Sequence, residues 1–362
     1  MNTQWFYDPN RDWDDNFDNG PFFDTIPELI RSGEPNFNFL GHPIYLPFGI
    51  AAGTLPTSKH IAAAFQWGYD VNHYKTMRSV PFPVNQFPQM IPVEADEGVS
   101  LEQAEKGLVM ADEFPEDLTK LVATNSFGNP GRGPEFWLDD MRKAVASTGK
   151  GQVMVASVVG TVQPGYSEDN YWQDFAETAK IAVDAGAKII EINLSCPNVA
   201  NEGIICYTPK AVSSISERVK KAIGTTPLLI KIGYFTDEQQ TMLEDIIADV
   251  DQYIAGVSLI NTIPAKVYDK SGNQALPGKG RLSSGLVGAG IKWAGLDMVK
   301  RMDDLRHSYG YQYQIVGIGG VITPDDFFEY REAGADLVQA CTGPMWNPNL
   351  VNEIRQAMNQ EF

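Results

Sequence analysis

The chain has 362 residues, of which 43% are hydrophobic, and this is enough apolar material for one large domain or two ordinary ones. A formal net charge of −18 argues against a partner that is nucleic acid or anionic lipid, because an acidic surface repels polyanions. There is no apolar run of about 18 residues, no signal-like start and no CxxC pair among the three cysteines, so we expect a cytoplasmic protein without membrane span, disulfide framework or metal site.

After an acidic arm that we place at residues 1–42, short β-branched or apolar runs alternate with longer amphipathic segments. The expected strands are 47–52, 69–75, 153–159, 188–194, 228–232, 256–261, 314–318 and 337–340. The expected helices are 58–67, 134–146, 170–185, 209–223, 237–248, 294–308, 324–333 and 348–359. Eight strand–helix units predict an α/β fold, a (β/α)8 TIM barrel over residues 43–362.

A doubly wound open sheet is the alternative fold, but the count of eight and the absence of GxGxxG after the first strand favour the barrel. Two long insertions interrupt the alternation, at residues 78–133 after the second strand and 263–293 after the sixth. Both leave the carboxyl ends of strands, where barrel enzymes carry their active sites. We therefore expect both insertions to cover an active site.

The residues that close the strands of a barrel point to one common site. Those with distinctive chemistry or small side chains are Ala51, Ala52, Gly53, Lys75, Asn125, Phe127, Gly128, Asn193, Cys196, Asn198, Lys231, Asn261, Thr262, Gly319, Gly320, Cys341 and Thr342. The glycine pair precedes a helix that starts with Thr323 and Pro324, and such a turn offers backbone N–H groups to an anion. A tight turn is the alternative, but Cys341-Thr342-Gly343 on the next strand favours a phosphate site.

Lys75 and Lys231 lie inside otherwise apolar runs, where a lysine is costly unless it is paired or functional. A side chain that reaches out to solvent is the alternative, although the inside of a barrel makes this awkward. A cation there would stabilise the anionic reduced form of a flavin.

Four asparagines converge without a neighbouring carboxylate, and amides suit a planar substrate with alternating N–H and C=O groups, such as a pyrimidinedione. Singly, each asparagine is more often a turn or cap residue. Cys196 is the group best suited to act as a base, since a thiol has a pKa of roughly 8.5 that a nearby cation can lower. A Cys–His hydrolase is the alternative, with His73 as the one histidine near a strand end.

Several motifs together resemble the dihydroorotate dehydrogenase family, flavoproteins with an FMN-bearing (β/α)8 barrel. The motifs are NSFGNP (125–130), NLSCPN (193–198), IKIG (230–233), INTI (260–263) and VGIGG (316–320). The resemblance implies oxidation of (S)-dihydroorotate to orotate in pyrimidine biosynthesis, with hydride from C6 to FMN and Cys196 as the base for the C5 proton. A cysteine base and the Lys75-Thr76 pair are similar to the soluble class 1 rather than the membrane-associated class 2.

The resemblance also implies roles for individual residues. Substrate would bind at Asn125, Asn193, Asn198, Asn261 and Thr262, with its carboxylate at the backbone of Phe127 and Gly128. FMN would contact Ala51, Ala52, Gly53, Lys75, Asn193, Lys231, Gly319, Gly320, Cys341 and Thr342, with Ser284 and Gly285 from the second insertion; Lys75 would also be catalytic.

The arm, Asn129, Gly131 and the segment after Asn198 depart from the family pattern. Two other functions remain open: a related FMN barrel that acts on uracil or thymine, as in dihydropyrimidine dehydrogenase, and a non-catalytic flavin-binding protein. The expected partners are the small-molecule substrate, a second copy in a homodimer, and an iron–sulfur flavoprotein subunit that passes electrons to NAD, with fumarate as another acceptor.

Overall fold

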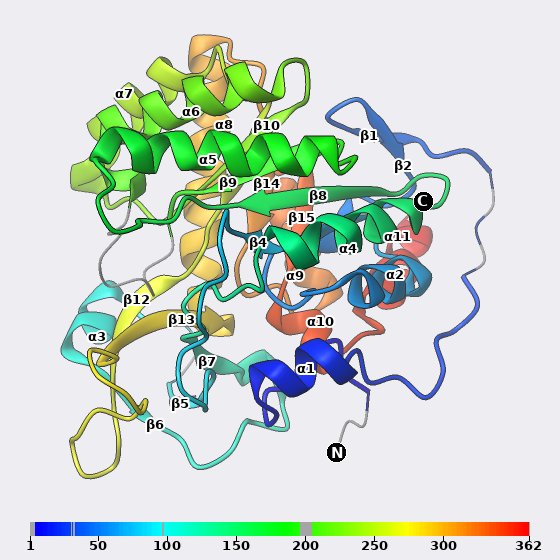
Figure 1. Ribbon diagram of the computed structural model, residues 1–362. Helices are drawn as coiled ribbons and strands as arrows, with labels where there is room; N and C mark the ends of the chain where they lie inside the picture. Colours follow the sequence, from blue (N-terminus) through cyan, green and yellow to red (C-terminus); the bar gives the residue numbers. More distant parts are fainter. Residues whose placement is uncertain (1–3, 30, 32, 96–97, 196–204, 362) are drawn as a thin grey trace.

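Eight parallel strands close into a barrel in the computed structural model, which describes residues 4–29, 31, 33–95, 98–195 and 205–361 (Figure 1). The barrel strands are β3 (Phe48–Ile50), β4 (Val71–Met77), β8 (Val153–Val158), β9 (Ile189–Asn193), β10 (Leu228–Ile232), β11 (Gly256–Leu259), β14 (Gln314–Ile318) and β15 (Leu337–Ala340). Each pairs in parallel with its neighbours in this order, and β15 pairs with β3 to close the ring. The predicted barrel is confirmed, and an open sheet is excluded.

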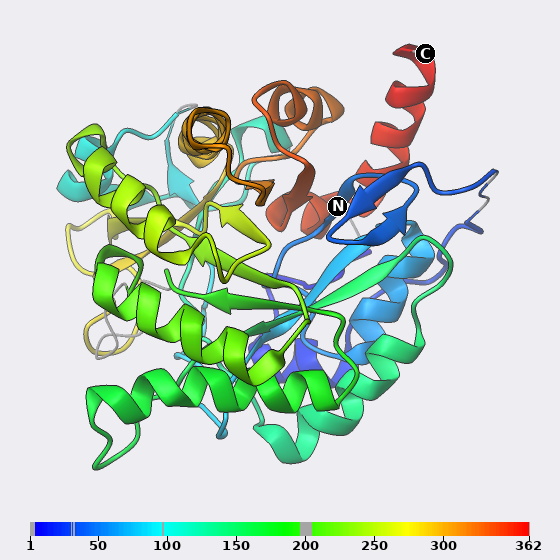
Figure 2. The same ribbon diagram turned by 90° about the horizontal axis from the view of Figure 1, so that it is seen from above.

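Helices surround the barrel on its outer side, as the view from above shows (Figure 2). They are α2 (Ser58–Trp67), α4 (Pro134–Ala146), α5 (Glu168–Asp184), α6 (Pro209–Ile223), α7 (Gln240–Val250), α8 (Lys292–Tyr309), α9 (Pro324–Glu332) and α11 (Leu350–Glu361). Local signals set their ends: Ser167 forms a capping box at α5, Thr323 caps α9 with a proline at its first turn, and Gly68 ends α2 with φ of 101°. These helices agree with the expected ones to within two or three residues at each end.

The interior of the barrel is apolar at its amino end and polar at its carboxyl end. Alternate residues of a strand share a face, so Val71, His73 and Lys75 follow one another along the inside of β4. On β9, Ile189, Glu191 and Asn193 follow the same order. The apolar layer joins a buried cluster, whereas the residues at the carboxyl ends line the cavity described below.

The two insertions, expected as separate covers, are joined into a single second sheet. Its strands are β5 (Val93–Glu94), β6 (Leu108–Met110), β12 (Ile263–Tyr268), β13 (Ser283–Gly288) and β7 (Val122–Asn125), in this spatial order. The helix α3 (Leu101–Lys106) lies against β12. The second sheet therefore fixes the first insertion to the second at the carboxyl end of the barrel.

The N-terminal segment contacts both ends of the barrel. An antiparallel hairpin, β1 (Phe37–Phe39) and β2 (His42–Ile44), joins the apolar cluster at the amino end of the strands. The helix α1 (Trp13–Asn19) lies at the other end, beside the first insertion. Figure 1 shows the hairpin and the second sheet at opposite ends of the barrel. The expected boundary between the arm (residues 1–42) and the barrel (residues 43–362) falls within this hairpin, at the first residue of β2. The division into two domains stays a prediction. Within the described ranges, no helix is long and apolar enough to cross a bilayer.

Candidate active site

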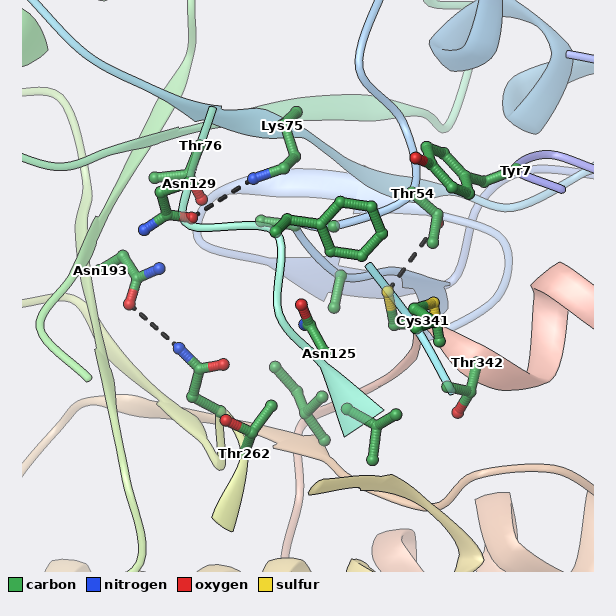
Figure 3. Close-up of a pocket in the computed structure, with 18 of the residues that line it drawn as sticks. Tyr7, Thr54, Lys75, Thr76, Asn125, Asn129, Asn193, Thr262, Cys341 and Thr342 are labelled. Carbon is green, nitrogen blue, oxygen red and sulfur yellow. Dashed lines mark hydrogen bonds between the residues drawn. The ribbon is translucent and has the colours of Figure 1, made fainter. Parts of the chain in front are cut away.

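A cavity lies at the carboxyl ends of the barrel strands, under the loop after β7 and beside the N-terminal arm (Figure 3). It holds about 840 Å³ of space between atoms, its open mouth included. The predicted site residues that line it are Ala51, Ala52, Gly53, Lys75, Asn125, Phe127, Gly128, Asn193, Lys231, Asn261, Thr262, Cys341 and Thr342. Cys196 and Asn198 lie outside the described residues. The fold thus gathers at one cavity most of the residues that sequence reasoning placed at strand ends.

Both predicted lysines are buried in the cavity wall, with Lys75 8% and Lys231 5% exposed. Lys75 Nζ donates to Asn129 Oδ1 at 3.3 Å and lies 5.9 Å from the centre of the Trp13 ring (Figure 3). The indole face and the amide oxygen both favour a charged ammonium group at this place. Asn129, noted in the sequence only as a departure, is therefore part of the site.

A buried carboxylate lies beneath Lys231, in the layer of the barrel next to the cavity. Glu191 Oε2 accepts from Ser258 Oγ at 2.8 Å and lies 3.2 Å from His73 Nε2, while Gln339 Nε2 lies 2.8 Å from His73 Nδ1. Burial alone would raise the pKa of Glu191, but its interactions with His73 and Lys231 outweigh this and lower the pKa to about 2. The glutamate is thus an anion that balances the buried cation above it, and His73 belongs to this network rather than to a hydrolase.

Three of the four predicted asparagines meet at the cavity from different elements. Asn261 Nδ2 donates to Asn193 Oδ1 at 3.1 Å, and this oxygen also accepts from the backbone N–H of Ser195 at 3.2 Å. Asn125, the last residue of β7, pairs with Gly285 of β13. Figure 3 shows Asn125 and Asn193 at the cavity, and together with Asn261 they offer donors and acceptors to a planar polar ring.

Ser284 and Gly285 lie behind the wall of the cavity rather than in it. A side chain at position 285 would begin 2.4 Å from Thr262 Oγ1, so the glycine makes room for the threonine that lines the cavity. The hydroxyls of Thr262 and Ser284 are buried and have no hydrogen-bond partner among the described residues. A buried hydroxyl without a partner is unusual in a native protein, and it suits a site that a ligand completes.

The glycine pair after β14 does not line the cavity, whereas Cys341 and Thr342 do. Gly319 and Gly320 have φ of 131° and 68°, which requires glycine, and Gly320 borders a shallow hollow beside Lys292. Burial raises the pKa of Cys341, against the charge of Lys231, so this thiol stays neutral. It is a wall residue and not a second base.

Two buried arginines hold the loop of residues 125–131 above the cavity, and neither was predicted. Arg78 donates to Asn129 O and to Gly160 O, each at 3.0 Å. Arg281, from the second insertion, donates to Ser126 O and Oγ, each at 3.2 Å. Their positions within irregular segments gave no sequence signal, because each bonds mainly to backbone oxygens that only the folded chain brings near.

The family model for dihydroorotate dehydrogenase matches residues 113–362. A dihydroorotate dehydrogenase of Dictyostelium discoideum is 33% identical over 353 residues, which cover 94% of each chain. This chain belongs to the dihydroorotate dehydrogenase family. The catalytic subunit of dihydroorotate dehydrogenase B (NAD(+)) of Petrotoga mobilis is 34% identical over 174 residues, 48% of this chain and 54% of that protein. That of Listeria monocytogenes serotype 4b is 29% identical over 201 residues, 54% of this chain and 62% of that protein.

Members of the dihydroorotate dehydrogenase family depend on FMN, and the cavity fits this cofactor. The floor formed by Ala51, Ala52 and Gly53 has only small side chains, and a side chain at position 53 would begin 2.6 Å from Cys341 Sγ. A flat ring can therefore lie close to the backbone there. The buried ammonium groups of Lys75 and Lys231 match an electron-accepting ring that gains negative charge on reduction.

Proposed function

We propose that this protein oxidises (S)-dihydroorotate to orotate with FMN, as a step of pyrimidine biosynthesis. The observation that carries the proposal is the convergence of two buried lysines and three asparagines at one cavity, in a chain of the dihydroorotate dehydrogenase family. FMN, when bound, supplies the acceptor for the hydride from C6 of the substrate. Ala51, Ala52, Gly53, Lys231, Cys341 and Thr342 are the residues that would hold it, with Gly319 and Gly320 next to its phosphate and Ser284 and Gly285 behind the wall.

The protein's own residues would orient the substrate and move its proton. Asn125, Asn193 and Asn261 would bind the N–H and C=O groups of the dihydropyrimidine ring, with Thr262 beside them and Asn198 as a fourth amide. The backbone of Phe127 and Gly128 would receive the carboxylate, near the ammonium group of Lys75. This arrangement explains how a protein with net charge −18 binds an anion.

We assign the removal of the C5 proton to Cys196. The support comes from the chain immediately before it, because the backbone N–H of Ser195 is bonded to Asn193 and its Oγ donates to Lys231 O at 3.3 Å. The strand that leads to the thiol is thereby fixed to the two substrate- and cofactor-binding residues.

Anaerobic mixing of the FMN-loaded protein with dihydroorotate tests the activity. We expect a prompt loss of the oxidised-flavin absorbance, and its persistence would contradict the proposal. Dihydrouracil and dihydrothymine should leave the absorbance unchanged, since they lack the carboxylate that the loop after β7 would bind. Rapid reduction by these compounds alone would instead favour a dihydropyrimidine dehydrogenase-like activity.

A Cys196→Ala variant tests the assigned base. We expect it to retain FMN and to lose roughly 100-fold or more in the rate of flavin reduction, which is the usual contribution of a positioned general base. Cys206 is buried away from the cavity, so Cys206→Ala is the matched control and should reduce at the wild-type rate. Equal rates for Cys196→Ala and the wild type would remove Cys196 from the mechanism.

The partners and the location follow from the same proposal. We infer a cytoplasmic homodimer whose acidic arm, residues 1–42, is distinct from the barrel domain. The names of the Petrotoga and Listeria relatives mention NAD and a catalytic subunit, which supports electron transfer to NAD through an iron–sulfur flavoprotein subunit. Steady-state turnover with fumarate, NAD or a quinone as the acceptor distinguishes the alternatives, and gel filtration with light scattering gives the oligomeric state.

A further inference from the structure

The N-terminal arm, far from β7 in the sequence, supplies one wall of the cavity through Tyr7. The Tyr7 ring lies edge-on to that of Phe127, with 5.4 Å between the ring centres and 88° between the planes. Trp13 packs on the same phenylalanine at 6.1 Å. Figure 3 shows Tyr7 with its hydroxyl end directed among the side chains that line the cavity.

The arm is folded tightly enough to hold Tyr7 in a defined place. Its base is closed by two backbone bonds between Trp5 and Phe22, at 2.9 and 2.8 Å. Inside it, the fully buried Asn16 accepts from the backbone N–H of Asp8 and donates to three backbone oxygens at 2.9 to 3.1 Å. The hydrogen-bonding groups of Asn16 are thus committed to the backbone of the arm, and Tyr7 is positioned between this loop and Phe127.

The Tyr7 side chain is 2% exposed, and its hydroxyl makes no hydrogen bond of ordinary length and angle among the described residues. The Asn16 side chain interacts weakly with this hydroxyl, but its own amide groups are bonded to the backbone of the arm. Three other buried tyrosines have an ordinary hydrogen bond: Tyr69 donates to Pro348 O, Tyr313 to Met302 O and Tyr330 to Gly319 O. Burial, and then the charge of Asp12, raise the pKa of Tyr7 well above its ordinary value, against a smaller opposing effect of the Asn16 side chain, so the hydroxyl keeps its proton and remains a donor. A donor held at a cavity without an ordinary hydrogen bond indicates a bond that a ligand completes.

We infer that the Tyr7 hydroxyl donates a hydrogen bond to an acceptor oxygen or nitrogen of the molecule bound in the cavity, so that the arm forms part of the ligand site. This rests on the proposed function, under which the bound molecule is either the flavin or the dihydropyrimidine carboxylate. Both carry ring acceptor atoms, and the experiment below distinguishes them. The arm then acts as a specificity element and not only as a cover.

The test uses the FMN-loaded Tyr7→Phe variant, which keeps the ring and its packing on Phe127 and removes the hydroxyl. Orotate affinity is measured from the shift of the flavin absorption spectrum, and FMN affinity from the fluorescence of flavin released on dilution. We expect about 3- to 10-fold weaker binding of one of the two, the usual effect of losing one hydrogen bond. Tyr313→Phe is the matched control, because it removes a buried hydroxyl bonded to Met302 O, far from the cavity, and should change neither affinity.

Weaker orotate binding with normal FMN retention assigns the bond to the substrate, and faster FMN release assigns it to the cofactor. Unchanged affinities for both, in a variant with the wild-type melting temperature, would overturn the inference. Failure of the proposed function looks different, since the wild-type protein itself would then not be reduced by dihydroorotate.

Discussion

At the residue scale, the site depends on two buried cations that are stabilised in different ways. Lys75 lies between an amide oxygen and the face of Trp13, whereas Lys231 lies above the carboxylate of Glu191. Glu191 is in turn held by Ser258 and approached by His73. Because a buried charge is tolerated only with compensation, the carboxylate of Glu191 offsets the cost of burying Lys231 at the cavity.

Replacing Lys231 with methionine should make the flavin harder to reduce. The neutral side chain of similar length removes a positive charge that favours the electron-rich form, so the midpoint potential should become more negative by about 30 mV or more for the two-electron couple. Spectroelectrochemical titration of the FMN-loaded protein measures this. Lys220→Met is the control, since Lys220 bonds to Thr226 O on the outer helix α6, and an unshifted potential in Lys231→Met would show that the cation does not act on the flavin.

The sequence predicted those site residues whose place follows from a strand end, such as Lys75, Asn193 and Lys231. Their positions required only that the strands form and that the barrel close. Tyr7 was missed because its role depends on packing against Phe127, which no local pattern records. Arg281 was missed for the same reason, as its partners are mainly backbone oxygens of the other insertion.

At the scale of elements, the arm is attached to α2 through a buried histidine. His60 Nδ1 lies 2.8 Å from Thr57 Oγ1, and a side chain at Gly20 of the arm would begin 2.7 Å from His60 Nε2. Burial, helped by the charge of Lys59, lowers the pKa of His60 to about 3. The imidazole is therefore neutral in the folded protein at any pH at which the enzyme would work.

The depressed pKa of His60 predicts acid sensitivity. Between pH 6.5 and 3 the unfolded chain binds a proton at this residue that the folded chain does not, so stability should fall as the pH falls, by about 1.4 kcal/mol per pH unit from this residue. The His60→Gln variant should lose less stability as the pH falls, since an amide does not titrate. Urea unfolding of both proteins at pH 7 and pH 5 measures the difference. If the wild type and His60→Gln lost the same free energy of unfolding between pH 7 and pH 5, His60 would have to take up its proton in the folded state as well.

Arg281, just before β13, supports the loop of residues 125–131 above the cavity and makes five hydrogen bonds to Ser126, Gln86, Pro88 and Pro277. Arg281→Met should loosen the loop that carries Phe127 and Gly128. We expect the KM for dihydroorotate to rise about 10-fold, with a smaller change in kcat, because the loop would bind the substrate carboxylate and does not supply the proposed base. Arg142→Met, an exposed arginine paired with Asp139, is the control for loss of a charge. Equal KM values in Arg281→Met and the wild type would show that the loop holds its shape without the arginine.

At the scale of the whole molecule, the barrel was predictable and the second sheet was not. Each barrel strand is a short apolar run next to an amphipathic helix, so the pattern repeats within about 40 residues and is visible locally. The second sheet pairs β7 with β13 and β6 with β12, which join residues 108–125 to residues 263–288. Short strands of mixed polarity, paired over such separations, have no local signature, so the sequence indicated two loops where the structure has one sheet.

The N-terminal segment contacts both ends of the barrel, so it can reach its final place only after the later strands have been synthesised. The arm is synthesised before the barrel, yet its partners Phe127 and Met345 are made much later, as is Gln314, to which the hairpin bonds. Tyr7 and Trp13 must therefore remain exposed until β15 and α10 (Thr342–Trp346) have been made. Because these aromatic side chains would be free to aggregate meanwhile, we expect the acidic residues around them, Asp8, Asp12, Asp14, Asp15 and Asp18, to help keep the nascent segment in solution.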